Sequence, residues 1–211
     1  MSKFAKKHAP EQFNDLVFAQ PEIGKRLQEY ASCKRTKPII LHGTYGGGKS
    51  TIAKLLVRAR DPINRGFWQT INCSCVEAGF LKPIEGTWRF AEWLEVEPMC
   101  ILEEADLLRK GHQFDVRAFI DQHGGMLVMT TNHLHAIDTS IRSRCDCIEI
   151  EPPEAENYLP VAQKILSSHG IVLDQKHLLR ILGECINWRD VLGALEDLVQ
   201  GALCERGLPA G

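Results

Sequence analysis

One short stretch decides how this chain folds: Gly43-Thr44-Tyr45-Gly46-Gly47-Gly48-Lys49-Ser50. Its spacing is G-x-x-x-x-G-K-[ST], in which glycines let several backbone N–H groups converge on one anion and a lysine adds a positive charge. The apolar run 37–42 before it is typical of a buried parallel strand, and the apolar spacing in 50–57 predicts a helix after it. Glycines that join a strand to the beginning of a helix predict a phosphate-binding loop.

The residue types in this loop fit the triphosphate of a nucleotide, for which we expect ATP with Mg²⁺. Backbone N–H groups would contact the β- and γ-phosphates, the ammonium of Lys49 would neutralise them, and the hydroxyl of Ser50 would ligate Mg²⁺. A glycine-rich turn that meets the spacing by chance is the alternative. The expected nucleotide contacts in this region are Gly43, Thr44, Tyr45, Gly46, Gly47, Gly48, Lys49, Ser50 and Thr51.

Polar residues follow two further apolar runs of the chain. Glu103 and Glu104 come directly after the run 99–102, and Asn132 follows the run 126–131. In a nucleotide site, the first acid would hold Mg²⁺, partly through water, and the second would be the general base toward the attacking water. The amide of Asn132 would orient that water, although an Asn after a strand is more often a turn residue.

The alternation of strand and helix patterns predicts an α/β fold in which helices flank a mostly parallel sheet. The expected strands are 37–42, 68–73, 99–102, 126–131 and 147–150. Helical candidates such as 114–123 lie between them. Two prolines, at 152 and 153, end the alternation, and only helical periodicity follows. We therefore expect a nucleotide-binding α/β domain at 1–151 and a small helical domain at 152–211.

Composition narrows the class of protein. The chain is 44% hydrophobic, which is ordinary for a soluble protein. No apolar stretch approaches the length of a membrane helix and no signal peptide is evident, so we expect a cytoplasmic protein. The eight cysteines contain no C-x-x-C pair, so reduced and mostly buried thiols are the main interpretation. A zinc site built from Cys73, Cys75 and a histidine is a minor alternative.

Charge is unevenly distributed along the chain. The first 60 residues carry 12 Lys and Arg against 4 Asp and Glu, whereas the remainder carries 13 against 23. Such asymmetry indicates a basic face and an acidic face, which would suit docking between unlike surfaces of subunits or contact with nucleic acid. Solvated helix surface is an equally good interpretation.

In this order, the motifs resemble those of AAA+ ATPases. They are most similar to the small, ATP-hydrolysing subunits of sliding-clamp loaders, the group of the replication factor C small subunit and its phage and bacterial counterparts. The resemblance extends over about 4–201, and its segment 7–17 is similar to one that packs over adenine. The stretches 102–106 and 130–132 resemble the acidic motif and first sensor, and 138–145 resembles the serine–arginine–cysteine signature. The resemblance implies a P-loop NTPase fold with a five-stranded parallel sheet and a helical lid.

The resemblance also assigns further site residues. Pro10 and Val17 would contact adenine. Arg144 would be an arginine finger that reaches the γ-phosphate bound by the adjacent subunit, where a delocalised cation stabilises the transferring phosphoryl group. Arg189, in a stretch similar to the second sensor, would touch the phosphates from the lid. Ordinary ion pairs are the alternative, with Asp146 or Glu149 for Arg144 and with Asp190 or Glu184 for Arg189.

The chain departs from the family pattern at three points. Glu103 stands where Asp is usual, and its longer side chain predicts slower hydrolysis with nucleotide binding retained. Phe18 stands where a glycine is usual near the adenine segment. Clamp-loader subunits also continue into a helical collar after the lid, so we expect either a truncated piece or assembly through AAA+ contacts alone.

Arg117 matches a family helix that couples subunits or DNA contact to hydrolysis.

The function implied by the resemblance is that of a DNA-replication ATPase of clamp-loader type. It would hydrolyse ATP at the interfaces of a homo- or hetero-oligomer, with DNA, other loader subunits and a sliding clamp as candidate partners. The sequence contains no recognised base-reading motif, so DNA contacts would go to phosphates. Two alternatives stay open: another AAA+ motor of the branch-migration or helicase-loading type, and a weakly active, ATP-gated scaffold subunit.

Overall fold

The computed structural model describes residues 2–63 and 65–205. At its centre is a five-stranded sheet in the order β2-β3-β4-β1-β5, and every neighbouring pair of strands is parallel. The strands are β1 (Ile39–His42), β2 (Trp68–Asn72), β3 (Met99–Glu103), β4 (Met126–Thr131) and β5 (Asp146–Glu149). The expected parallel five-stranded sheet is therefore confirmed.

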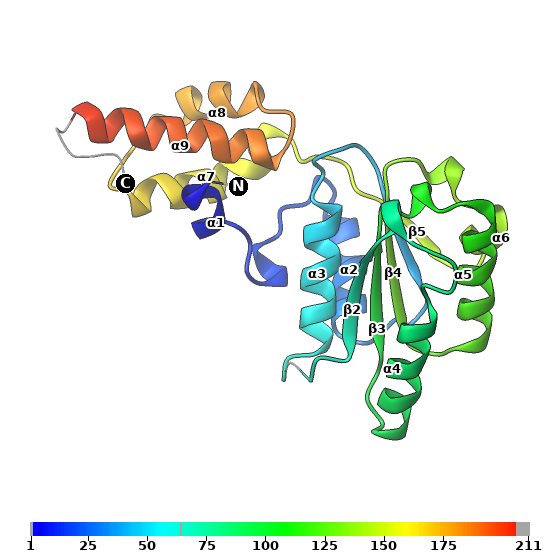
Figure 1. Cartoon of the computed structure of the whole chain (residues 1–211). Helices are drawn as coiled ribbons and strands as arrows, with labels where there is room; N and C mark the ends of the chain where they lie inside the picture. Colours follow the sequence, from blue (N-terminus) through cyan, green and yellow to red (C-terminus); the bar gives the residue numbers. More distant parts are fainter. Residues whose placement is uncertain (1, 64, 206–211) are drawn as a thin grey trace.

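Helices cover both faces of this sheet (Figure 1). One face carries α2 (Pro21–Ala31) and α3 (Lys49–Arg60), and the other carries α4 (Lys82–Trp93), α5 (Lys110–Gln122) and α6 (Thr139–Arg142). Successive side chains of a strand point to opposite faces. Ile39 and Leu41 accordingly pack with α2 and α3, whereas Ile40 packs with α4 and α5. All three are fully buried, as a continuous apolar strand requires.

Short 3-10 turns connect several of these elements, and one of them corrects an expectation. The turns are η1 (Phe13–Asp15), η2 (Cys73–Cys75), η3 (Ala105–Leu107) and η4 (Leu134–Ala136). The strand expected at 68–73 includes Cys73, but β2 ends at Asn72 and Cys73 begins η2, so that boundary is wrong. The side-chain oxygen of Asn72 accepts a hydrogen bond from the N–H of Ser74 at 2.8 Å, which ends β2 and starts the turn.

The cysteines differ in burial, and Cys147 and Cys185 are intermediate. Burial raises the pKa of Cys73 to about 12, as expected of an inert core thiol. Cys100 and Cys145 are also buried, but Cys33, Cys75 and Cys204 are exposed, so the expectation of mostly buried thiols holds only in part. Within the described ranges, no three potential metal ligands come together, which leaves the zinc alternative without support.

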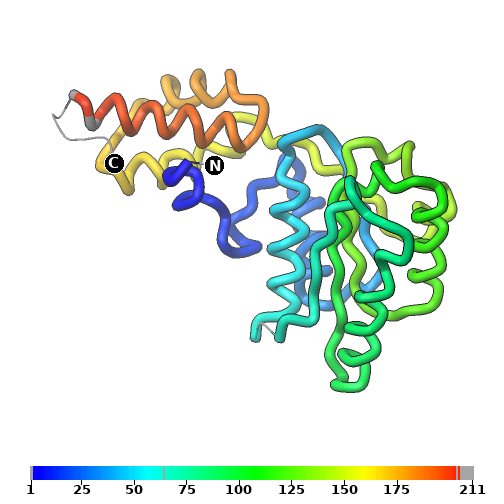
Figure 2. The backbone as a smooth tube through the Cα atoms, in the orientation of Figure 1, coloured from blue at the N-terminus to red at the C-terminus, as the bar shows by residue number. Residues whose placement is uncertain are grey.

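A helical bundle follows the sheet, made by α7 (Ala155–Ser168), α8 (Gln175–Gly183) and α9 (Trp188–Glu205). It has its own core cluster, in which Tyr158, Leu178 and Leu195 are buried. The short helix α1 (Lys3–Lys7) packs on this bundle, and the Ser2 hydroxyl donates to Glu196 of α9 at 2.7 Å. Figure 2 shows the blue N-terminal tube beside the yellow α7. The division of the chain at 151/152 therefore stays a prediction.

In the two described ranges, no helix has the length and apolarity needed to cross a membrane.

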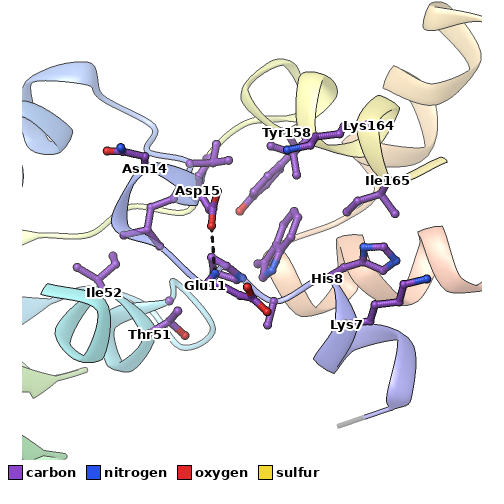
Figure 3. Close-up of a pocket in the computed structure, with 18 of the residues that line it drawn as sticks. Lys7, His8, Glu11, Asn14, Asp15, Thr51, Ile52, Tyr158, Lys164 and Ile165 are labelled. Carbon is purple, nitrogen blue, oxygen red and sulfur yellow. Dashed lines mark hydrogen bonds between the residues drawn. The ribbon is translucent and has the colours of Figure 1, made fainter. Parts of the chain in front are cut away.

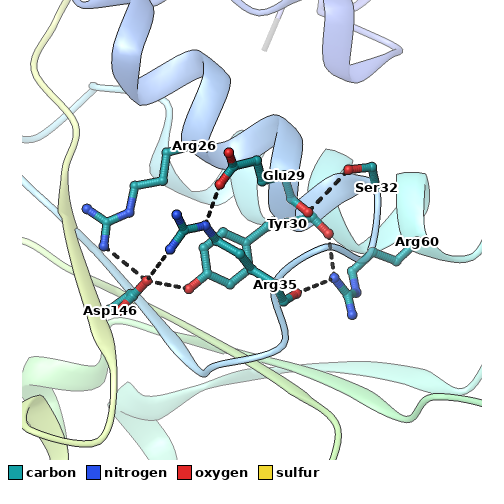
Figure 4. Close-up of polar contacts among 7 residues, drawn as sticks. All are labelled: Arg26, Glu29, Tyr30, Ser32, Arg35, Arg60 and Asp146. Carbon is teal, nitrogen blue, oxygen red and sulfur yellow. Dashed lines mark hydrogen bonds and ion pairs between the residues drawn. The ribbon is translucent and has the colours of Figure 1, made fainter.

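Asp146, the first residue of β5, ties α2 to the sheet (Figure 4). Its carboxylate accepts a hydrogen bond from the Tyr30 hydroxyl at 2.6 Å and pairs with Arg26 at 3.0 Å and Lys37 at 3.3 Å. Partial burial opposes ionisation of this carboxyl, but hydrogen bonds from these three neighbours lower its pKa to about 2. The buried guanidinium of Arg60 also holds the end of α2 by donating to the carbonyl oxygen of Tyr30.

Asp146→Asn should destabilise the chain at pH 7 by about 1–2 kcal/mol, because the neutral amide loses the ion pairs. A carboxyl with a depressed pKa stabilises the fold above its unfolded pKa, about 3.9. That stabilisation is lost as the pH falls toward the folded pKa of about 2. The difference in urea-unfolding free energy between wild type and variant should therefore be constant above about pH 5 and shrink below about pH 4. A difference that does not change with pH would contradict this role.

Candidate functional site

A cavity of about 580 Å³ lies where the N-terminal segment, the beginning of α3 and the helical bundle meet (Figure 3). This volume is within the range of small-molecule sites. The expected contacts that line it are Pro10, Val17, Gly47, Gly48 and Thr51. The other expected contacts belong to the loop at its edge and do not line it: Gly43, Thr44, Tyr45, Gly46, Lys49 and Ser50.

Aromatic and aliphatic side chains form the bundle side of the cavity. The rings of Tyr158 and Trp188 stack with centroids 5.4 Å apart and an angle of 28°. Val161 and Ile165 of α7 add aliphatic surface. Flat apolar walls beside a glycine-rich loop suit a planar base whose attached phosphates reach the loop. Sequence reasoning missed the stacked pair, because Tyr158 and Trp188 lie on different helices, α7 and α9, and no local pattern connects them.

The glycine-rich loop has a backbone that requires glycine. Gly43 has φ +138°, and a Cβ there would lie 2.3 Å from the carbonyl oxygen of Ile150. Gly48, with φ +82°, is the N-cap of α3. The loop surrounds the head of Lys49, whose Nζ donates to the carbonyl oxygens of Gly43 at 2.9 Å and Thr44 at 2.6 Å. Burial lowers the pKa of Lys49, and the N-terminus of α3 favours an anion at this position.

The strand order brings the expected catalytic residues beside this loop. β4 lies between β1 and β3, so the carboxyl ends of all three parallel strands meet at one edge. Glu104 is exposed there, and its N–H donates to the Thr130 hydroxyl at 3.3 Å. Asn132 follows β4, and the preceding Thr131 donates its hydroxyl to Asp106 at 2.8 Å, which holds the two strand ends together. The acid Glu104 and the amide Asn132 therefore lie at the carboxyl edge of the sheet, where the glycine-rich loop also lies.

Glu103 has a partner that the sequence did not indicate. Its Oε1 lies 3.0 Å from Nζ of Lys54 on α3. That oxygen is buried and accepts no well-aligned hydrogen bond from the described part of the chain, so its interaction with Lys54 is electrostatic. Ser50 lies four residues before Lys54 and shares its helix face. A hydroxyl and a carboxylate are the oxygen ligands that Mg²⁺ takes, so Ser50 and Glu103 fit a magnesium site.

Arg144 lies at the other end of the sheet. It lies just before the amino end of β5, separated from the strand by Cys145, whereas the loop follows the carboxyl end of the parallel β1. Its guanidinium contacts both carboxylate oxygens of Asp121 on α5, at 2.6 and 3.0 Å, and donates to the Ser140 carbonyl at 2.8 Å. The hydrogen bond from Arg144 lowers the pKa of Asp121. An ion pair is therefore formed, but the expected partners Asp146 and Glu149 are wrong.

Arg189 lies in the first turn of α9, next to the loop. Asn187 caps this helix by accepting from the N–H of Arg189 at 2.9 Å, and Asp190 accepts from the amide of Asn187 at 3.0 Å. Gly46 approaches Asn187 so closely that a Cβ on the glycine would lie 2.9 Å from Asn187 Cγ. The Arg189 side chain is exposed, and no ion pair with Asp190 or Glu184 is formed among the described residues.

Two further residues that the family pattern singled out lie away from the cavity. Phe18 packs beside Phe13, with ring centroids 6.1 Å apart, and against Gly24, where an added Cβ would lie 3.0 Å from the Phe18 ring. Its bulk is therefore accommodated by α2 and does not narrow the cavity. The guanidinium of Arg117, on α5, lies 4.5 Å from the centroid of the Phe114 ring.

Curated proteins of replication and recombination are similar in sequence to this chain. It is 26% identical to the replication-associated recombination protein A of Bacillus subtilis over 210 residues, which cover 93% of this chain and 48% of that protein. It is 24% identical to the replication factor C large subunit of Methanosarcina acetivorans over 191 residues, covering 85% and 30%. The chain thus spans less than half the length of these relatives. No family model matches it.

Solved structures share its fold. Two mutant forms of RuvB from Thermotoga maritima match with TM-scores of 0.70 and 0.68, at 14% and 13% sequence identity. Each match covers 95% of this chain and 68% of the RuvB chain. The likeness therefore includes the helices after the sheet as well as the sheet itself.

Lys49→Ala should weaken the binding of a nucleoside triphosphate by about 10- to 100-fold, because charge-assisted hydrogen bonds to phosphate are lost. Titration with a fluorescent ATP analogue, with Mg²⁺ present, measures the affinity. Lys82→Ala is the matched control, since Lys82 is exposed at the beginning of α4. Equal affinities of wild type and Lys49→Ala would rule out a phosphate site at this loop.

Proposed function

The chain has the AAA+ fold and resembles the ATPases of the clamp-loader group, and on this premise we propose that it binds and hydrolyses ATP within an oligomer that acts on DNA. The observation that carries the proposal is the glycine-rich loop. Its positive-φ glycines surround a buried lysine head at the N-terminus of α3, and it borders an apolar cavity of about 580 Å³. This combination of surfaces suits a base joined to a triphosphate.

The residues at the strand ends support hydrolysis. Loop N–H groups and Lys49 bind the polyphosphate and neutralise its charge. Asn132 orients the attacking water, and Glu104 takes a proton from it. The water oxygen bonds to the γ-phosphorus while the bond from that phosphorus to the β–γ bridging oxygen breaks. When bound, Mg²⁺ would neutralise negative charge on the triphosphate. Ser50 and Glu103 would hold it.

Arg144 would act on a neighbouring subunit. It lies at the opposite end of the sheet from the loop of its own chain, so a second copy must bring it to a nucleotide. In that position its planar cation would stabilise the charge of the transferring phosphoryl group. Arg189, two residues from the contact between Asn187 and Gly46, would reach the phosphates within one chain. ATP binding would then order both the bundle and the subunit interface.

A clamp-loader role is the finer proposal, with DNA phosphates and a sliding clamp as partners. Similarity to replication factor C large subunits supports it. An exposed aromatic pair supports a protein partner: Phe90 and Trp93 of α4 stack with centroids 5.9 Å apart and are 55% and 76% exposed. Exposed clustered aromatics on a folded chain are typical of interaction sites.

A recombination or branch-migration motor is the second candidate. The likeness to replication-associated recombination protein A in sequence, and to RuvB in fold, favours it. Such a motor would use the same nucleotide site and the same trans arginine, but it would act on DNA without a clamp. A third candidate, a weakly active ATP-gated scaffold, rests on Glu103 in place of aspartate.

Arg144→Ala should lower DNA-stimulated kcat by about 10³-fold, because the site of each neighbour loses its finger. ATP affinity should stay within about 2-fold, since the arginine acts in the transition state. Phosphate release across protein concentration measures the first quantity, and fluorescent nucleotide titration measures the second. Arg109→Ala is the control, because Arg109 is an exposed arginine at the N-cap of α5.

Mixing Arg144→Ala with Lys49→Ala separates a trans finger from a structural effect. The first variant keeps an intact phosphate loop, and the second keeps an intact finger. Mixed oligomers should therefore recover part of the activity that each variant lacks alone. No recovery in oligomers shown to contain both variants would contradict action across a subunit interface.

A pull-down with a purified sliding clamp in the presence of ATP should retain the wild-type chain under the clamp-loader proposal. The double variant Phe90→Ala/Trp93→Ala should lose clamp retention and keep its ATP affinity, because these rings lie outside the cavity. Salt-sensitive DNA binding without clamp retention by the wild type would favour the recombination motor. If added DNA changes neither the retention of the chain by the clamp nor its ATP turnover, the result would favour the ATP-gated scaffold.

A further inference from the structure

The Glu103 carboxylate of the candidate site is the expected partner of Mg²⁺ and also the observed partner of Lys54. Glu103 ends β3 and is the acid expected to hold Mg²⁺, yet its Oε1 already lies 3.0 Å from Nζ of Lys54. The Glu103 side chain is 18% exposed and that of Lys54 is 43% exposed, so water screens this ion pair only partly. The contact lies beside the glycine-rich loop and not on a remote surface.

The position of Lys54 follows from the geometry of α3. Ser50 is in the first turn of this helix, and Lys54 lies one turn further on the same face. The Lys54 side chain reaches the carboxyl end of β3, since its Nζ lies 3.0 Å from Oε1 of Glu103, the last residue of that strand. A cation held between the Ser50 hydroxyl and the Glu103 carboxylate would therefore lie close to the Lys54 ammonium. Two like charges would then repel each other.

We propose that Lys54 is a positioning residue that holds the Glu103 carboxylate and competes with Mg²⁺ for it. The lysine thereby sets the affinity of the nucleotide site for divalent cation. Mg²⁺ can interact with the Glu103 carboxylate only when the ion pair between Glu103 and Lys54 breaks. This inference rests on the proposed ATP site and deepens it. By the reciprocity of linked equilibria, Lys54 weakens Mg²⁺ binding by the same factor by which Mg²⁺ weakens the ion pair.

The length of the acidic side chain is part of this arrangement. Glutamate reaches one methylene further than aspartate from the end of β3, and this reach brings its carboxylate to Lys54. Glu103→Asp draws the carboxylate back toward the strand and lengthens the ion pair. The competition then weakens in Glu103→Asp even though Lys54 is retained.

The test is a titration of the full chain with a fluorescent ATP analogue, in EDTA and at a series of Mg²⁺ concentrations. Lys54→Met should lower the Mg²⁺ concentration for half-maximal gain in nucleotide affinity by about 5-fold or more. Lys54→Arg should keep the wild-type value, because it keeps the charge. Arg58→Met, one further turn along α3 at an exposed cation, is the matched control and should change nothing.

A second pair of variants tests whether the effect of Lys54 on Mg²⁺ affinity depends on the Glu103 carboxylate. Glu103→Gln should raise the half-saturating Mg²⁺ concentration, and Lys54→Met should have no further effect on that background. An unchanged or raised value in Lys54→Met, measured also in Lys54→Gln in case the first variant folds poorly, would overturn the inference. A loss of nucleotide affinity in EDTA would also overturn it, because Lys54 would then bind phosphate directly.

Failure of the ATP site itself would look different. In that case the wild type would show no Mg²⁺-dependent affinity and Lys49→Ala would match it. A normal response in the wild type with no change in Lys54→Met would remove only the role given to Lys54.

Discussion

The turn from β1 into α3 is the constraint on which the rest of the structure depends. The chain leaves a strand buried on both faces and enters a helix within residues 43–48. It can do so only because Gly43 has no Cβ to meet the carbonyl oxygen of Ile150. Ile150, which directly follows β5, is held beside the end of β1, because its N–H donates to the His42 carbonyl at 2.7 Å. The free N–H groups of the helix therefore open at the carboxyl edge of the sheet.

The parallel order of the strands then divides the molecule into two functional ends. The carboxyl ends of β1, β3 and β4 meet, which gathers Lys49, Glu103, Glu104 and Asn132. Arg144 precedes β5 and so lies at the amino ends, where Asp121 holds it. A single chain keeps these ends apart, so the proposed role of Arg144 requires a neighbouring copy.

The helical bundle completes the cavity from the other side. Tyr158 and Trp188 form its aromatic wall, while the segment 7–17 crosses from the bundle to the sheet. The bundle also touches the loop directly, through Asn187 against Gly46. A nucleotide in this cavity would contact both parts of the chain, so its binding and the placement of the bundle would be linked. Charge at the strand end, where Lys54 meets Glu103, would add a dependence on divalent cation to that linkage.

Local pattern was enough to predict the five strands, the glycine-rich loop between β1 and α3, and the acids at the carboxyl end of β3. Periodicity, glycine spacing and chain direction are all properties of consecutive residues. The fold class followed, because parallel strands separated by helices have few ways to pack. The partners of individual side chains could not be read in this way. Lys54 with Glu103, Arg144 with Asp121 and Tyr158 with Trp188 join elements far apart in the chain. Such contacts depend on strand order and helix placement, so only the folded chain decides which charges and rings meet.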